Sequence, residues 1–326
     1  MPSPQRPVRD KVIVITGTSS ITVGDVQISH LYDLVADFPF PRTLDRAFPA
    51  VPAEAWEPYR RAYPSLFGPG NVPRFHAGCY LIRSPGRTIL VDTGIGPARL
   101  GMAKLFGTGG HLPDRLRSAG VSPEDIDTVM FTHLHPDHVG WNLQHDGGRY
   151  RPTFPRARYV AHRADWDTVR RAEVQQKLAA IAPGYVGQTL TPLESLGVLD
   201  LADGDHHNIS QEVTALHTPG HTPGSMSLLI ASNGERAILV GDAIGHPAQV
   251  EHPDWGVVDD MDGPHAEQTR RQLLDRIEAE GLVFSASHFP EPFFGRVVRL
   301  QGRRTWQALA APAAAGPGAG RAPGRP

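Results

Sequence analysis

Apolar positions along the chain fall into short strand-like runs interrupted by helical stretches. Two apolar runs, at 76–84 and 87–94, are joined by Ser-Pro-Gly, which is typical of a hairpin. Residues 265–282 have amphipathic helical periodicity, with a stop signal at Gly281. Further strands are expected at 126–132, 158–166, 213–220, 225–232, 236–244, 282–289 and 295–306, and further helices at 112–119 and 167–182.

The ends of the chain and one internal segment depart from this pattern. Residues 12–20, VIVITGTSS, look like a strand entering a dinucleotide loop, but Ile21 and Thr22 stand where glycines would be required. We therefore interpret residues 1–20 as an N-terminal extension or edge strand. Residues 38–74 are rich in proline and aromatics, and predict an irregular segment with one short helix near 54–63. This segment is expected either to wall a pocket or to pack over a sheet edge.

The C-terminal residues are dominated by alanine, proline and glycine and predict a disordered tail. The expected organisation is thus an extension at 1–20, one large domain at 21–307 and a tail at 308–326.

The amino-acid composition argues against some classes of binding partner and indicates the cellular compartment. The 326 residues include 32 Lys and Arg against 34 Asp and Glu, so a basic footprint for nucleic acid or anionic membrane is not expected. No run reaches the roughly 20 apolar residues of a membrane span, and no signal peptide is evident. The one cysteine, Cys79, cannot form an intramolecular disulfide and is expected to be a buried small hydrophobe. These features predict a cytoplasmic protein.

The densest polar block follows an apolar strand, where the chain reads FTHLHPDHVGWN. Alternate side chains of an extended chain point the same way, so His133, His135 and Asp137 should share one side at the mouth of a sheet. Pro136 fixes its own backbone angle and helps to turn His138 toward the same cavity. Imidazole and carboxylate suit Zn, Mn, Fe or Co, and no cysteine lies near enough for a structural thiolate site. The block predicts a metal site but leaves open how many cations bind.

Three later blocks place candidate ligands just after other apolar runs. HTPGHTPG (217–224) ends one run, Gly-Asp (241–242) ends another, and Ser-His-Phe (287–289) ends a third. Together with HxHxDH, and in this order, these blocks resemble the metallo-β-lactamase superfamily over residues 21–306. The resemblance implies an α+β fold, a four-layer αββα sandwich whose two sheets bring the ligands together along one edge.

The resemblance also implies two cation sites with a complete ligand set. The first would be held by His133, His135 and His221, and the second by Asp137, His138 and His288, with Asp242 bridging the two. By the same resemblance, His217 has a structural or second-shell role. Asp92, in VDTG, matches a motif that buttresses the HxHxDH loop, although a plain turn aspartate is the alternative.

The implied chemistry is hydrolysis. Two divalent ions, Zn²⁺ first with Mn, Fe or Co as alternatives, would share a bridging hydroxide that attacks the substrate. The layout resembles the lactonase and organophosphate-hydrolase branch. Lactonases of that branch often carry a tyrosine three residues after the bridging aspartate, where this chain has Gly245 followed by His246. We name Asp137 and His246 as catalytic candidates. His246 would serve as proton donor or rim contact, with a surface histidine as the alternative.

Aromatic residues beside the ligand-bearing loops are candidates for an apolar pocket, and core or surface packing explains each of them equally well. They are Trp141, Trp255, Phe289, Phe293 and Phe294. Tyr185, in a loop flanked by Pro-Gly, is a candidate for closing over the site.

We therefore expect a hydrolase of a small-molecule lactone or other carboxylic ester, resembling the N-acyl-homoserine lactonases. An organophosphate or aryl ester hydrolase of the same fold is the first alternative. A persulfide dioxygenase with a single iron is the alternative from another enzyme class. Glyoxalase-II-like thioesterases share the ligands but carry a C-terminal glutathione-binding segment, where we expect only a short stretch and a disordered tail. No nucleic-acid or membrane partner is expected, and a homodimer is left open.

Overall fold

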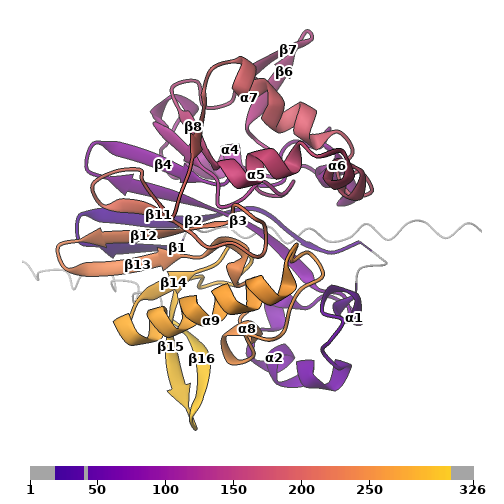
Figure 1. The fold of residues 1–326 in the computed structure, drawn as a ribbon, viewed down its shortest axis with the longest axis vertical. Coiled ribbons are helices and arrows are strands. Elements are labelled where there is room, and N and C mark those ends of the chain that lie inside the picture. The colour runs from indigo at the N-terminus through magenta and orange to yellow at the C-terminus, as the bar shows by residue number, and fades with distance from the viewer. Residues whose placement is uncertain (1–18, 40–42, 310–326) are drawn as a thin grey trace, which may run out of the picture.

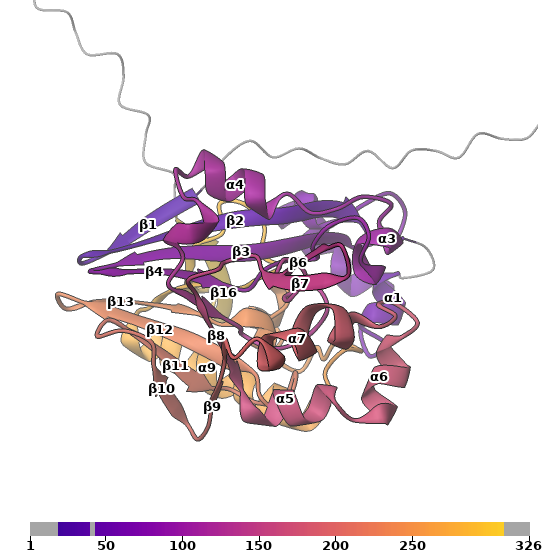
Figure 2. The same ribbon diagram turned by 90° about the horizontal axis from the view of Figure 1, so that it is seen from above.

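Two seven-stranded sheets pack face to face in the computed structural model, which describes residues 19–39 and 43–309 (Figures 1 and 2). The first sheet has the strand order β1 (Ser19–Val23), β2 (Val26–Asp37), β3 (Arg74–Ser84), β4 (Arg87–Val91), β5 (Thr128–Met130), β8 (Arg158–His162), β9 (Leu199–Ala202). The second has the order β10 (His206–Asn208), β11 (Val213–His217), β12 (Met226–Ser232), β13 (Glu235–Leu239), β14 (Val283–Ser285), β15 (Gly295–Leu300), β16 (Arg303–Ala308). A separate hairpin joins β6 (Leu143–Asp146) to β7 (Arg149–Pro152).

Helices cover the outer faces of this sandwich. The α-helices are α1 (Leu44–Ala47), α2 (Glu57–Ala62), α3 (Gly101–Leu105), α4 (Leu112–Ser118), α5 (Arg163–Val169), α6 (Ala172–Leu178), α7 (Thr191–Ser195), α8 (Ala248–Glu251) and α9 (Gly263–Glu280). Short 3₁₀ turns lie at Ala53–Trp56, Pro64–Leu66, Pro123–Asp125 and Gly241–Ala243, and a π-helical turn lies at Val186–Leu190. In Figure 2, α4 lies above the first sheet and α9 lies below the second. None of the helices in the described ranges combines the length and apolarity that a bilayer span requires.

The alternation of side chains along the strands produces the layers. On β3, Tyr80 and Ile82 point into the space between the sheets, whereas Leu81 points outward to the helices of the first sheet. On β13, Leu239 points into the same central space, and Ile238 packs outward with Leu274 of α9. The result is the predicted four-layer αββα arrangement.

Two expectations from the sequence need correction. The strand expected at 158–166 ends at His162, because Arg163 begins α5 and the His162 side chain accepts a hydrogen bond from the Ala164 N–H at the helix start. Residues 38–74 contain four short helical turns instead of one helix. These turns bury Trp56 and pack against Ala248 of α8. Most of the predicted N-terminal extension (1–18) and tail (310–326) lies outside the described residues.

A buried aspartate joins the first sheet to the loops that follow it. Asp33 lies at an irregularity in the β2–β3 register, between Tyr32 and Leu34, and is 1% exposed. Its carboxylate accepts hydrogen bonds from four groups, which are Ile95 N (2.7 Å), Gly96 N (3.3 Å), Leu112 N (2.7 Å) and Trp141 Nε1 (2.8 Å). There is no room for a larger residue at Gly110, where an added Cβ would lie 2.0 Å from Asp33 Oδ2. One carboxylate therefore organises the start of α4 and two loops.

Replacing Asp33 with alanine should destabilise the fold strongly. The substitution leaves four buried N–H donors without their acceptor, and each unsatisfied donor costs about 1–3 kcal/mol. We expect a loss of about 3–5 kcal/mol in the free energy of unfolding, measured by urea denaturation. Asp114→Ala is the control, because that carboxylate is 64% exposed and its loss should not move the midpoint measurably. A loss below about 1 kcal/mol for Asp33→Ala would contradict this role.

Candidate metal centre

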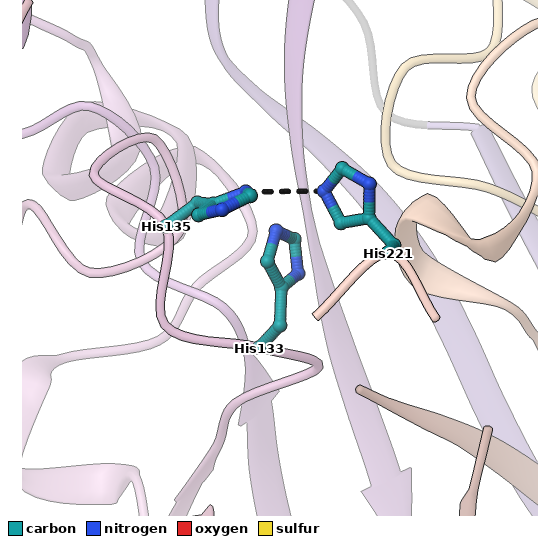
Figure 3. Close-up of side chains that lie close together, drawn as sticks. All are labelled: His133, His135 and His221. Carbon is teal, nitrogen blue, oxygen red and sulfur yellow. Dashed lines mark hydrogen bonds between the residues drawn. The ribbon is translucent and has the colours of Figure 1, made fainter. Parts of the chain in front are cut away.

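Seven candidate ligands meet where strands of both sheets end. The loop after β5 carries His133, His135, Asp137 and His138, and His221 lies in the loop after β11. Asp242 follows β13, and His288 follows β14. The ligand atoms form two groups, each with its members within 4.8 Å of one another: His133, His135 and His221; and Asp137, His138, Asp242 and His288. Figure 3 shows the three rings of the first group pointing toward one another, with a dashed line between His135 and His221.

The Asp242 carboxylate lies between the two groups. Its Oδ2 is 3.8 Å from His133 Nε2 and 3.6 Å from His221 Nε2 on one side. On the other side it is 3.5 Å from His138 Nε2 and 2.9 Å from His288 Nε2. The carboxylate of Asp242 therefore faces both ligand groups.

The donor set fits divalent cations. Among the described residues, His133 Nε2, His138 Nε2 and Asp242 Oδ1 are buried without a hydrogen-bond partner. Buried polar atoms are normally satisfied, so three orphaned ones within the two ligand groups need an explanation, and bound cations would supply it. Imidazole nitrogen with carboxylate oxygen is the donor mixture that zinc and its neighbours accept.

Electrostatics within the chain also favour a cation. Burial raises the pKa of Asp242, but the imidazoles of His288, His138 and His133 outweigh burial and hold that pKa well below its usual value. Burial lowers the pKa of His288, but Asp242 and Asp137 outweigh it and raise the pKa to about 9. At His135 burial dominates and lowers the pKa to about 4. Asp242 is therefore ionised, and a cation would displace a proton from His288.

Asp92 supports the HxHxDH loop from behind. It is fully buried in a left-handed backbone conformation, with φ at 60°. Its Oδ1 accepts from Thr132 N (2.8 Å), and its Oδ2 accepts from Thr132 Oγ1 (2.8 Å) and lies 2.8 Å from His138 Nδ1. This contact orients His138 so that its Nε2 faces the site. The buttressing role, and not the plain turn aspartate, is what the geometry shows.

Sequence reasoning missed a second support, Asp165 in the first turn of α5. Its Oδ2 accepts from Leu134 N (3.2 Å) and Thr222 Oγ1 (2.9 Å), and its Oδ1 accepts from Gly224 N (2.6 Å). One carboxylate thus joins the loop of His133 and His135 to the loop of His221. An acidic residue at a helix start has an ordinary explanation, so no signal in the sequence singled it out.

Another missed residue, Asp260, contacts a ligand directly. Its Oδ1 lies 3.0 Å from His221 Nδ1, and the side chain is 1% exposed. Burial raises the pKa of Asp260, but its hydrogen bond with His221 and the charges around it lower the pKa overall. His288 is oriented in a similar way by the backbone, because its Nδ1 donates to His76 O at 2.6 Å.

His246 lies in an aromatic cluster instead of on the surface. It is 8% exposed, and its ring makes edge contacts with Phe48, Trp56, Tyr59 and Phe67 at centroid distances of 5.1–6.4 Å. Its Nδ1 accepts a hydrogen bond from the Ala248 N–H (3.0 Å), so the ring hydrogen is on Nε2. Burial lowers its pKa to about 3, so the ring is neutral near pH 7.

Several other sequence candidates lie away from the ligand groups. Phe289, Phe293 and Phe294 are at most 1% exposed and belong to the core, so their proposed pocket role is wrong. They are next to a ligand in sequence, but the loop between β14 and β15 places their side chains in the core. Tyr185 is buried and donates to Leu134 O (3.2 Å), so it holds the HxHxDH loop and does not close over the site. His217 stacks on His162 at 4.1 Å, outside both ligand groups.

The last two aromatic candidates, Trp141 and Trp255, are only partly buried. Trp141 is partly buried, and its indole N–H is held by Asp33. Trp255 stacks on His252 with ring centroids 4.4 Å apart and packs against the aromatic cluster of residues 44–67.

Comparison with known proteins identifies a matching family model and relatives with two different named activities. The family model described as "Metallo-beta-lactamase superfamily" matches residues 72–288. An N-acyl homoserine lactonase of Bacillus sp. is 30% identical over 189 residues, covering 54% of this chain and 66% of the relative, just under two thirds. One from Bacillus cereus is 29% identical over 203 residues, covering 58% and 72%. An acyl-coenzyme A thioesterase, MBLAC2 of Bos taurus, is 26% identical over 209 residues, covering 64% and 70%.

Solved structures share the fold. The hydrolase AbOPH, described as in the beta lactamase superfamily, superposes with a TM-score of 0.74 and 22% identity, over 91% of this chain and 99% of that one. AidC, described as a dizinc quorum-quenching lactonase, superposes with a TM-score of 0.73 and 22% identity, over 90% and 98%. The family model covers more than half of the chain, and its matched range contains all seven candidate ligands. The chain therefore belongs to the metallo-β-lactamase superfamily, as the order of its motifs predicted.

Proposed function

We propose that the protein is a dinuclear metal-dependent hydrolase that opens a lactone or cleaves another carboxylic ester. The observation that carries the proposal is the placement of Asp242 between two complete ligand groups. Two divalent ions held there would lower the pKa of a shared water from its bulk value toward about 7 and polarise the ester carbonyl. Zinc is the expected metal, because the donors are imidazole and carboxylate and because AidC is described as dizinc.

The lactone assignment draws on the relatives and on one departure from their pattern. Both Bacillus relatives are named N-acyl homoserine lactonases. The position of the lactonase tyrosine is Gly245, where an added Cβ would meet only Gln249 Oε1, at 3.7 Å. Open space at this position favours a bulkier leaving group as well, so an aryl ester or organophosphate is the second candidate. A single-iron dioxygenase is less well supported, because the second ligand group is complete.

We infer that His246 donates a hydrogen bond to the leaving oxygen. Its Nε2 carries the ring hydrogen and has no partner among the described residues. The Gln249 amide oxygen holds the backbone of this turn by accepting from Gly245 N (2.7 Å) and His246 N (3.1 Å). Asp137, our other catalytic candidate, lies with its Oδ2 3.7 Å from His288 Nε2, where it would act as a ligand to the second cation.

The reaction class can be tested with a zinc-loaded assay panel. Acyl-homoserine lactones, γ-lactones, aryl esters, thioesters and paraoxon-type phosphotriesters should be compared at matched concentrations, with metal content measured in parallel. We expect two metal ions per chain and turnover highest on lactones or carboxylic esters. One iron per chain with oxygen uptake would contradict the proposal and support the dioxygenase.

Removing a ligand should abolish both metal retention and turnover. For His135→Ala we expect the first cation to be lost, and for Asp242→Ala both cations should be weakened, because this carboxylate faces both groups. The readouts are metal content by mass spectrometry and kcat/KM. His217→Ala is the matched control, because it lies in the same HTPGH block but outside both groups. Full activity of either ligand variant in a metal-free preparation would refute the proposal.

The role of His246 predicts a dependence on the leaving group. His246→Ala should lower kcat about 100-fold or more on alkyl lactones and much less on aryl esters, because an alkoxide leaving oxygen carries more charge than a phenoxide and gains more from the hydrogen bond. The variant should not shift the acidic limb of the pH–rate profile, because the pKa of His246 is already about 3. His145→Ala is the control, because that histidine is exposed on β6 and lies outside both ligand groups. An equal loss on all substrates would show that His246 only packs the aromatic cluster.

A further inference from the structure

Helix α9 packs against the back of the His221 loop. The Thr269 hydroxyl donates to Pro219 O (2.6 Å), and Asp262 N, just before the helix, donates to Gly220 O (3.0 Å). Backbone and helix are so close that a Cβ added at Gly220 would lie 2.4 Å from Ala266 Cα, which only glycine tolerates. The position of this loop is thus set by α9.

From the same helix, Arg270 reaches three other segments. It is fully buried and donates from Nε to Ala243 O (2.9 Å), from Nη1 to Pro253 O (2.7 Å) and from Nη2 to Asp260 Oδ2 (3.2 Å). Ala243 directly follows the bridging candidate Asp242. A buried guanidinium is costly unless its donors are satisfied, and a planar fork suits several fixed acceptors at once. A side chain that only filled space at position 270 would not need to be arginine.

Asp260 continues this contact to a ligand. While its Oδ2 accepts from Arg270, its Oδ1 accepts from His221 Nδ1 at 3.0 Å. A hydrogen held on Nδ1 leaves the Nε2 lone pair free, and that nitrogen faces His135 Nδ1 (3.0 Å) and Asp242 Oδ2 (3.6 Å). The carboxylate therefore selects both the tautomer and the orientation of the ring.

We propose that Arg270 and Asp260 are positioning residues that fix His221 and the Asp242 turn relative to each other and thereby complete the first cation site. The two ligands come from loops that follow different strands, β11 and β13, and the chain Ala243–Arg270–Asp260–His221 is a direct hydrogen-bonded connection between them. The proposal depends on the proposed function in one respect, because it requires that cations occupy the site. It requires no particular substrate.

The test measures cation affinity instead of activity. Stepwise Zn²⁺ binding to the full-length metal-free protein is followed by competition with a chromophoric chelator, and Co²⁺ binding by its visible spectrum. For Asp260→Asn we expect the affinity of one cation to fall about 10- to 100-fold, while the other changes by less than about threefold. Arg270→Lys should have an effect of the same kind, because one ammonium group cannot reach all three acceptors.

Two comparisons separate positioning from general support. Arg271→Lys, one residue along the same helix, alters only an exposed pair with Glu267 and should leave both affinities unchanged. Because Arg270 and Asp260 act through one chain of contacts, the double variant should lose little more than the larger single loss. Asp260→Asn preserves the side-chain volume, so the test remains valid even if Arg270→Lys reduces the yield of folded protein.

Three results of these binding measurements would contradict the positioning role, and they differ in what they imply for the proposed function. Unchanged affinities in both variants would overturn the positioning role while leaving the proposed function intact. An equal loss at both sites, accompanied by a lower unfolding midpoint of the metal-free protein, would also overturn it, because the residues would then be structural only. Absence of Zn²⁺ binding by the unaltered protein would contradict the proposed function itself, and the positioning role with it.

Discussion

A buried carboxylate surrounded by imidazoles is the constraint on which the rest of the structure depends. Asp242 Oδ2 lies within 3.8 Å of a nitrogen of His133, His138, His221 and His288. These rings come from three separate segments that belong to different sheets, so the arrangement requires both sheets to end at one edge. Burying this many ionisable groups is unfavourable unless charge compensates charge, and the orphaned ring nitrogens indicate that the compensation within the chain is incomplete. A pair of divalent cations would complete it.

Outer carboxylates fix the geometry of the ligand loops. Asp92 holds the HxHxDH turn, Asp165 joins that turn to the His221 loop, and Asp260 contacts the His221 ring itself. Each is buried and accepts two or more hydrogen bonds, which offsets the cost of burial. Such supports orient ligands before a cation binds, so little reorganisation is needed at the moment of binding. Asp33 organises the neighbouring loops of the first sheet in the same way.

Local sequence patterns predicted the features that depend on neighbours in the chain. The hairpin of β3 and β4 follows from its Ser-Pro-Gly turn, and the end of α9 follows from Gly281, which adopts φ of 59° at the helix C-cap. The ligand blocks and the fold followed from motif order. Asp165 and Asp260 were not predicted, because they approach the ligands only through tertiary packing and no spacing marks them. For Phe289, Phe293 and Phe294 the sequence left pocket lining and core packing open, because they adjoin a ligand in sequence, and the structure buries all three in the core.

The most direct test of the central claim is anomalous X-ray scattering at the zinc absorption edge from crystals of the zinc-loaded protein. Two peaks about 3.5–4 Å apart, with the Asp242 carboxylate between them, are the result that a shared dinuclear centre predicts. A single peak among His133, His135 and His221, with His138 and His288 outside its coordination sphere, would contradict the account.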